Sequence, residues 1–251
     1  YDIAAAFESV TKWVGEIDRP ERVPELMRRA FTCLRTGRPG PVLVTVPRGL
    51  GAYDDGSDPY RPVRGWHWGP DPDDIDAAVD ALLSAEAPLL YAGEGVFYAG
   101  ATEALREFAE TAGIPVLTSL KGKSAFPEDH PLSLGVRGEL ANQFLRRSDL
   151  LLVVGSSLSP GHFRHAIPNA RDKVLIHCTL DPIDINTVYA TDHALVGDAD
   201  LALQALTEAL VGRLGGPPGP DAALLKEIEL LRDRFMDRYR PLLNSDDTPI
   251  N

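Results

Sequence analysis

The stretch 88–138 constrains the fold of this chain more than any other. It opens with a short apolar run that stops at Gly93 and Gly95, and apolar positions then recur at helical spacing until Gly113, after which a second apolar run, 114–117, follows at once. This pattern predicts a strand, a helix that ends at a left-handed glycine, and a second strand parallel to the first. The crossover between parallel strands is expected to be right-handed. The glycine pair falls where the first strand passes into the helix, which is where an open parallel sheet receives its ligands.

The same alternation predicts a domain over residues 73–211. Asp73 is the predicted N-cap of its first helix. Beyond the opening unit, the pattern predicts a helix over 140–147 and a last helix over 201–210. Between them it predicts three strands, 150–154, 173–178 and 194–196. Because five strands alternate with helices and no tight hairpin signal occurs, the predicted fold class is α/β, a doubly wound parallel sheet of the Rossmann-like type.

The segments on either side read as parts of neighbouring domains. Residues 1–50 contain a predicted helix, 20–36, and an apolar strand, 42–46, but one helix cannot cover both faces of a strand. Residues 51–72 have the composition of a linker, rich in Pro, Gly and Asp. Residues 212–251 hold a second linker, an amphipathic helix that is predicted to stop before Pro241, and a polar tail. Since the chain also begins with Tyr, we expect it to be a piece of a longer protein.

The charge and the cysteine content argue against several classes of function. The 251 residues carry a net charge of -12, which disfavours a protein that follows the phosphates of nucleic acids. No apolar run approaches the length of a membrane span and no signal peptide opens the chain, so no membrane partner is expected. The two cysteines, Cys33 and Cys178, form no disulfide framework and are expected to be reduced thiols, as in a cytoplasmic protein.

The glycine turn has two interpretations. Gly93 and Gly95 form an incomplete dinucleotide fingerprint, because Tyr98 stands where a third glycine is expected. The two glycines allow close approach to a phosphate in front of a helix N-terminus, but a plain turn from strand to helix explains them equally. Lys121 and Lys123 lie at the end of the second strand, where they either neutralise a phosphate or are solvated.

Neither a catalytic nor a metal site is predicted from the residues. Ser157, Asp181 or Asp184, and His193 occur in the order of a hydrolase triad, but the second glycine that the sharp nucleophile turn needs is missing. A zinc site would need a second ligand pair, and the remaining candidates offer none, so satisfied or solvated histidines are expected. These candidates are His162, His165, His177 and Cys178.

Short segments throughout the chain occur in the order and spacing of one enzyme family. They resemble thiamine-diphosphate-dependent enzymes of the acetolactate synthase and pyruvate oxidase type. The end of the pyrimidine-binding domain is matched by Val10-Thr11-Lys12-Trp13, Arg38-Pro39-Gly40-Pro41-Val42 and Val46-Pro47-Arg48. The central domain is matched by Gly93-Glu94-Gly95-Val96, Gly113-Ile114-Pro115-Val116, Lys121-Gly122-Lys123, Pro127-Glu128-Asp129-His130-Pro131-Leu132, Ser148-Asp149-Leu150 with Gly155, Asp181-Pro182 and Gly197-Asp198. The start of the diphosphate-binding domain is matched by Thr248-Pro249-Ile250-Asn251.

The resemblance implies a full-length protein of three α/β domains, a homodimer or homotetramer with thiamine diphosphate and Mg²⁺ held between subunits. Such an enzyme makes or breaks a bond next to the carbonyl carbon of a 2-oxo acid. The activating Glu and the Gly-Asp-Gly segment with its Asn do not occur here, because Gly197-Asp198-Ala199 lacks the second Gly. The fragment alone is therefore expected to be inactive, and the central domain to be mainly structural.

The resemblance also implies positions that line the cleft of the central domain. The implied cofactor-binding residues are Gly93, Gly95, Val96, Lys121, Gly155, Ser156, Asp181 and Asp198. Arg137 and Gly138 match a loop that turns toward the active-site mouth, where Arg137 would meet an anionic substrate or remain a solvated side chain.

Two departures argue against FAD. Relatives that bind FAD carry an Arg-Phe-Asp-Asp-Arg-like run where this chain has 156–160, and Ile-Asp-Ile-Asp-Pro where it has 178–182. Two other interpretations remain open, namely a free-standing module that binds FAD, ADP or NAD, and a scaffold that binds no small molecule.

Overall fold

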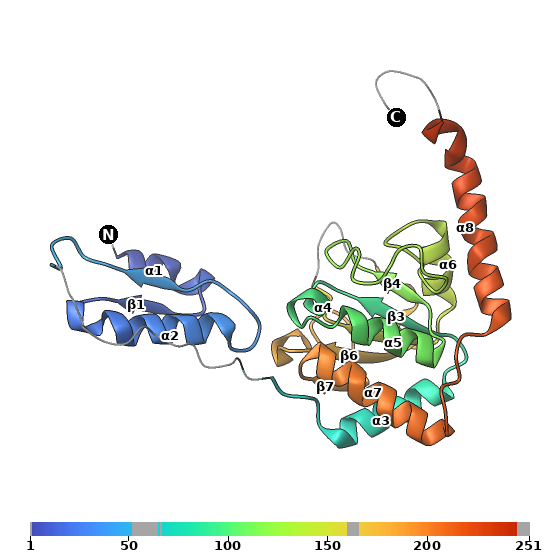
Figure 1. The fold of residues 1–251 in the computed structure, drawn as a ribbon, viewed down its shortest axis with the longest axis horizontal. Helices are drawn as coiled ribbons and strands as arrows, with labels where there is room; N and C mark the ends of the chain where they lie inside the picture. Colours follow the sequence, from blue (N-terminus) through green and yellow to red (C-terminus); the bar gives the residue numbers. More distant parts are fainter. Residues whose placement is uncertain (1, 52–64, 66, 160–165, 245–251) are drawn as a thin grey trace. The chain divides into compact units, whose positions relative to one another are not determined.

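The computed structural model describes residues 2–51, 65, 67–159 and 166–244 (Figure 1). The chain divides into two compact units, residues 1–67 and 68–251, and each is described by itself. Within the described residues, no helix combines the length and the apolar character that crossing a membrane requires.

The first unit contains two short parallel strands and one long helix. Its elements are α1 (Ile3–Phe7), η1 (Glu8–Val10), β1 (Val14–Glu16), η2 (Pro20–Arg22), α2 (Val23–Arg35) and β2 (Leu43–Thr45). The predicted helix and strand are confirmed as η2 with α2, and as β2. The sequence does not predict β1, because it has only three residues and its central Gly15 leaves the space that the indole of Trp13 occupies. Lys12 then joins β1 to the end of α2 by donating hydrogen bonds to the carbonyls of Thr36 and Arg38.

The second unit is organised around a five-stranded parallel sheet with the order β4-β3-β5-β6-β7. The strands are β3 (Pro88–Ala92), β4 (Val116–Thr118), β5 (Leu150–Val154), β6 (Val174–Thr179) and β7 (His193–Val196). This sheet confirms the predicted α/β fold class. All five residues of the central strand β5 are buried, which explains why its sequence is uniformly apolar rather than alternating. The strand order reverses at β3, and ligands of open sheets bind outside the carboxyl ends of the strands at such a reversal.

Helices cover both faces of the sheet (Figure 1). They are α3 (Pro72–Ser84), α4 (Gly95–Tyr98), α5 (Thr102–Ala112), α6 (Glu139–Arg147), α7 (Ala199–Leu214) and α8 (Ala222–Leu243). Helices α3, α5 and α7 pack side by side, and α6 lies on the other side of the sheet, against α8. As the sequence predicts, α5 ends at Gly113 in the left-handed conformation, with φ +67°.

Two predicted helix ends are wrong by a few residues. The N-cap of α3 is Asp71 rather than Asp73, because the Asp71 carboxylate accepts the Asp73 N–H at 2.9 Å and Pro72 takes the first helical position. Helix α8 does not stop before Pro241. Proline there removes only its own N–H from the last turn, and the Asn244 N–H still bonds to the Arg240 carbonyl at 3.1 Å.

The predicted alternation of strands and helices also fails after β5. In the described part of the connections from β5 to β6 and from β6 to β7, only single 3-10 turns occur, η3 (Ala170–Asp172) and η4 (Pro182–Asp184). Local backbone geometry opposes a helix in the second connection, where Pro182 restricts its preceding residue and Asn186 adopts φ +58°. The strands β5, β6 and β7 are therefore adjacent in the sheet in the same order as in the chain, and the connection from β6 to β7 is short.

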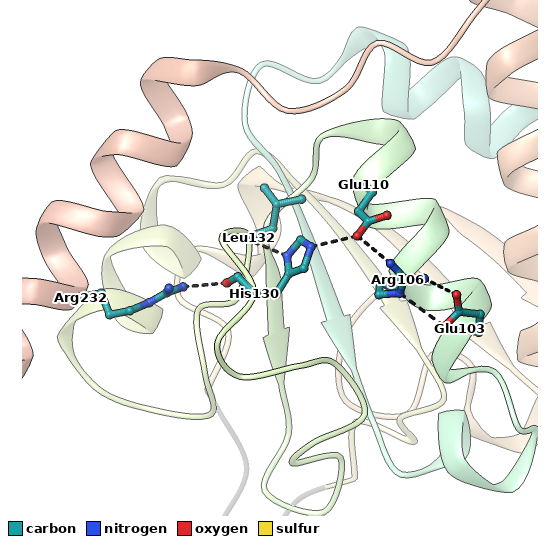
Figure 2. A network of polar contacts seen from close by, with 6 residues as sticks. All are labelled: Glu103, Arg106, Glu110, His130, Leu132 and Arg232. Atoms are coloured by element: carbon teal, nitrogen blue, oxygen red, sulfur yellow. Dashed lines mark hydrogen bonds and ion pairs between the residues drawn. The ribbon is translucent and has the colours of Figure 1, made fainter.

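Helix α8 is joined to the sheet through the loop before residue 134 (Figure 2). Arg232 donates to the carbonyls of His130 and Ser133 at 2.9 and 2.8 Å. The His130 ring faces α5, with Nε2 3.1 Å from the Glu110 carboxylate, while its Nδ1 accepts the Leu132 N–H at 3.1 Å. Because Nδ1 accepts a hydrogen bond, Nε2 carries the proton and donates it to Glu110.

Candidate functional site

The segments that leave β3 and β5 touch each other through backbone atoms alone. Gly93 N–H donates to the Val154 carbonyl and Gly95 N–H to the Gly155 carbonyl, both at 2.8 Å. A Cβ at Gly93 would lie 2.3 Å from the Gly155 oxygen, and a Cβ at Gly155 would lie 2.7 Å from the Val96 nitrogen. The glycines are thus required by this close contact between chain segments. Phosphate contact at the same turn stays a prediction.

The loop after β4 closes on the same turn. A Cβ at Gly122 would lie 2.6 Å from the Ala92 carbonyl oxygen, and the Ser119 hydroxyl accepts the Gly122 N–H at 2.9 Å. Lys121 Nζ lies 3.1 Å from the Glu94 carboxylate, in the middle of the glycine turn. The Lys121 side chain is 75% exposed, so this lysine lies at the carboxyl edge of the sheet with its charge balanced by Glu94.

Ser156 is bound to β6 by a buried histidine. His177 Nε2 donates to the Ser156 carbonyl at 2.7 Å. Burial lowers the pKa of His177, and this outweighs the opposite effects of that hydrogen bond and of the Asp184 charge. His177 is therefore a neutral link between β6 and the segment after β5. The sequence favoured a satisfied or solvated His177 over a zinc ligand, but it did not give the partner of the ring. A histidine inside an apolar strand is the signal that marks such a buried, hydrogen-bonded side chain.

The hydrolase arrangement does not form among the described contacts. Ser157 Oγ lies 2.7 Å from Ser159 Oγ, and the histidine near this segment, His177, contacts a backbone carbonyl instead of a hydroxyl. His193 begins β7, on the far side of β6 from β5.

Asp181 and Asp198 follow β6 and β7 at the same sheet edge, but each begins a helical segment. The Asp181 carboxylate accepts the Ile183 N–H at 3.1 Å at the start of η4. The buried Asp198 carboxylate accepts the Asp200 N–H at 3.0 Å at the start of α7. Burial raises the pKa of the Cys178 thiol to about 12, and the nearby Asp198 charge adds to that shift. Both carboxylates therefore have a structural role as N-caps.

Arg137 is exposed on the loop that joins β4 to α6, and its place at an active-site mouth stays a prediction. Gly138, with φ +114°, is the N-cap of α6 and holds a conformation that other residues avoid. Burial raises the pKa of Tyr91 on β3 to about 12, Tyr189 adds to that shift, and the Arg137 charge opposes it. Arg137 thus lies near enough to Tyr91 to act on it electrostatically.

The structure therefore brings some of the predicted residues together and leaves others further along the edge. The residues at the ends of β3, β4 and β5 form one contact region: Gly93, Gly95, Val96, Lys121, Gly155 and Ser156. Asp181 and Asp198 lie beyond it at the ends of β6 and β7. We call the contact region the glycine crevice.

Comparison of the sequence with known proteins identifies one enzyme family. Residues 75–206, just over half of the chain, match the family described as thiamine pyrophosphate enzyme, central domain. A probable acetolactate synthase large subunit of Methanocaldococcus jannaschii is 34% identical over 99% of this chain and 43% of its own length. A glyoxylate carboligase of Escherichia coli O157:H7 is 32% identical over 82% of this chain and 36% of its own length.

Solved structures agree with the sequence relatives. A putative thiamin diphosphate-dependent enzyme from Mycobacterium smegmatis superposes with a TM-score of 0.71 at 29% identity, over 88% of this chain and 43% of that one. A benzoylformate decarboxylase from Polynucleobacter necessarius superposes with a TM-score of 0.67 at 27% identity, over 81% of this chain and 40% of that one. The chain belongs to the thiamine pyrophosphate enzymes and contains their central domain. It spans less than half the length of the curated relatives it matches.

Among the residues that the structure describes, the nearest match to a cofactor motif has a structural role. The segment Gly197-Asp198-Ala199 is the nearest match to a metal and diphosphate motif, but Asp198 is 5% exposed and caps α7. The backbone of Gly197 packs against Pro70, and a Cβ there would lie 2.7 Å from the Pro70 nitrogen. Among the residues that the structure describes, no group of three or more His, Cys, Asp or Glu side chains is arranged to hold a metal ion.

Proposed function

We propose that this chain is the central region of a thiamine-diphosphate-dependent decarboxylase or carboligase that acts on 2-oxo acids, as in acetolactate synthase. The observation that carries the proposal is the 34% identity to an acetolactate synthase large subunit over 99% of the chain. The longer protein would act as a homodimer or homotetramer in the cytoplasm, with thiamine diphosphate and Mg²⁺ bound by residues outside this chain. Thiamine diphosphate supplies the carbanion chemistry in such enzymes.

The role that we assign to the central domain is positional. Among the described residues at its carboxyl edge, the carboxylates of Asp181 and Asp198 cap helical segments, and the buried His177 joins β6 to the segment after β5. These polar groups support the fold. Arg137 and Gly138 are the exceptions that we assign to the substrate channel. The exposed guanidinium of Arg137 would orient a carboxylate through two parallel N–H donors.

A nucleotide in the glycine crevice is a second candidate function. It is favoured by one observation, that the crevice lies where the strand order reverses. The phosphate would lie against Gly93, Gly95, Val96 and Gly155, near Lys121 and Ser156, and Asp181 and Asp198 would lie further along the edge. This candidate is tested by thermal denaturation with ADP, FAD or NAD, since a ligand at a hundred times its Kd adds roughly 2.7 kcal/mol of stability.

The main proposal is tested by comparing this chain with the full-length protein. The full-length protein is expected to consume pyruvate or another 2-oxo acid when thiamine diphosphate and Mg²⁺ are supplied, and Arg137→Ala in that protein is expected to raise KM for the acid more than it lowers kcat. The 251-residue chain is expected to give no binding heat with thiamine diphosphate and Mg²⁺ in calorimetry. Micromolar binding to the chain, or a full-length protein inert toward every 2-oxo acid, would contradict the proposal.

A further inference from the structure

A cavity of about 580 Å³ lies at the opposite edge of the sheet from the glycine crevice. Its floor is formed where β3 and β4 begin, by Pro88, Leu89 and Pro115, and its walls are the end of α6 and the beginning of α8. Sites for small molecules in proteins typically have volumes of about 300–1,000 Å³. The cavity therefore has the size of a small-molecule site, and neither the family match nor the proposed function assigns it a role.

Apolar side chains form one part of the lining. Leu89 and Phe144 are buried to 1% and 3% exposure, and Leu224 of α8 is partly buried against the same core. These side chains offer a surface on which the hydrocarbon part of a ligand would be removed from water.

The charged side chains of the lining are mostly acidic. They are three carboxylates, Glu86, Asp221 and Glu227, and one guanidinium, Arg147. Arg147 is already engaged, because its Nη1 lies 2.6 Å from the Glu227 carboxylate and its guanidinium lies 3.8 Å from the centre of the Phe144 ring. Two carboxylates, those of Glu86 and Asp221, are left without a cation among the lining residues.

The two uncompensated carboxylates differ in their surroundings. Asp221 accepts the Ala223 N–H at 3.2 Å as the N-cap of α8, which occupies one of its lone pairs. For the Glu86 carboxylate, the described residues provide no hydrogen bond or ion pair, since the Glu86 contact to Asp149 is made by its backbone N–H. Glu86 is thus the carboxylate most available to a ligand.

The helix ends at the cavity contribute partial charges of both signs. The amino end of α8 carries a partial positive charge and is capped there by Asp221. The carboxyl ends of two other helices have the opposite sign. Helix α5 ends at Gly113 and helix α6 ends at Arg147, and both residues line the cavity. The carboxyl end of a helix carries a partial negative charge, which favours cations within about one turn. The chain that leads into α8 holds this arrangement in place, because Gly219 N–H donates to the Thr111 carbonyl at 3.0 Å.

From these features we propose that the cavity binds a small organic cation, an ammonium or guanidinium group carried on an apolar body. The cationic group would lie between Glu86 and Asp221, and the apolar body would lie against Leu89, Phe144 and Leu224. The position of Arg147 on the Phe144 ring shows that a cation is accommodated in contact with these walls. An anionic ligand would meet two carboxylates that have no cation among the lining residues, and the lining guanidinium, Arg147, is already paired with Glu227.

Three probes that share one apolar body test this assignment: phenethylamine, phenethyl alcohol and phenylpropionate. Calorimetry or amide chemical shifts of the whole 251-residue chain should show binding of the amine, with shifts confined to the cavity, and weaker or no binding of the other two. Glu86→Gln and Asp221→Asn should each weaken amine binding by about 1.5- to 5-fold, the range of a partly exposed ion pair. Asn retains the ability to cap α8, so the second variant leaves the helix start intact.

A matched control lies on α5, where Glu107 is exposed and is absent from the lining. Glu107→Gln should leave amine binding unchanged, and thermal denaturation confirms that all three variants fold. The proposal is overturned if no probe binds at millimolar concentration, if the alcohol or the carboxylate binds as tightly as the amine, or if the double variant Glu86→Gln/Asp221→Asn keeps full affinity.

Discussion

Asp149 holds the start of β3 through Ala87 and its neighbour Glu86. The two carboxylate oxygens of Asp149 accept the backbone N–H groups of Glu86 and Ala87 at 2.7 and 2.9 Å. Asp149 comes directly before β5, so a side chain at the start of one strand satisfies the backbone that leads into the next strand of the sheet. Loss of this charged acceptor costs free energy, more at the part-buried N–H of Ala87 than at the exposed N–H of Glu86, which water can reach.

Asp149→Asn should therefore destabilise the chain. The Asn side chain keeps one oxygen, which can accept one of the two backbone N–H groups. Its NH₂ group faces the other backbone N–H, so that hydrogen bond is lost and two donors face each other. We expect a fall of about 1–3 kcal/mol in the free energy of unfolding, measured with urea. Asp129→Asn, at an exposed loop position, is the control and should change stability by less than about 0.5 kcal/mol. Equal effects of the two substitutions would show that the Asp149 contacts contribute nothing.

The glycine crevice gives a second prediction, based on two glycines with nearly the same backbone. Gly155 and Gly100 have φ values of +64° and +67°, but a Cβ would lie 2.7 Å from the Val96 nitrogen at Gly155 and would meet nothing within 4 Å at Gly100. Gly100→Ala should cost about 1–2 kcal/mol, from the left-handed conformation alone. Gly155→Ala should cost about 1–3 kcal/mol more, because the backbones leaving β3 and β5 must separate. Unfolding in urea measures both, and similar costs would refute the close contact.

These examples show how far the sequence predicts the fold. The continuous apolar runs at β3 and β5 and the left-handed Gly113 are local signals, and they predict the sheet and the end of α5 correctly. The reason for Gly93 and Gly95 is not local, since it lies in the contact with Gly155, 60 or more residues further along the chain. Sequence spacing therefore gave no sign of this backbone contact, and phosphate contact at the same turn stays a prediction.

The same limit explains the carboxylates at the sheet edge. Asp181 and Asp198 stand after strands, where a sequence pattern favours contact with a cofactor, but the N–H groups that they accept belong to the segments they begin. A capping role can be predicted from sequence only when the first residue of the helix is predicted correctly. At α3 the predicted cap was Asp73 and the observed cap is Asp71, so the predicted start was wrong by two residues. The cavity under α8 was beyond prediction, because four separate segments form it.

His177 gives a prediction about pH. Its pKa in the folded chain is lowered below the ordinary 6.5, mainly by burial. The unfolded chain then binds a proton that the folded chain does not, so the contribution of His177 to stability is present above about pH 6.5 and is lost as the pH falls toward the lowered folded value. Between about pH 7.5 and 5.5, the free energy of unfolding should fall less in His177→Gln than in the wild-type chain.

His193→Gln controls for the other histidines, because His193 lies at the start of β7 rather than in the middle of a strand. It should leave the pH dependence close to that of the wild-type chain. An NMR titration of the His177 ring gives an independent measurement, and a ring that becomes charged at or above pH 6.5 would rule out the neutral link between β6 and Ser156.

Arg232 gives the last prediction, which concerns how α8 is held. Its guanidinium donates to the carbonyls of His130 and Ser133 in one loop. His130 in turn donates to Glu110 of α5, and Figure 2 shows the contacts that link Arg232, His130 and Glu110. Arg232→Met keeps much of the aliphatic side chain but removes both charged donors. It should lower the free energy of unfolding by about 1.5–3 kcal/mol and increase amide hydrogen exchange in the 127–135 loop. Arg234→Met, which removes an exposed guanidinium two residues along the same helix, should do neither. If both variants destabilise the chain equally without faster exchange in the loop, α8 is held by its apolar face alone, through Ile228 and its neighbours.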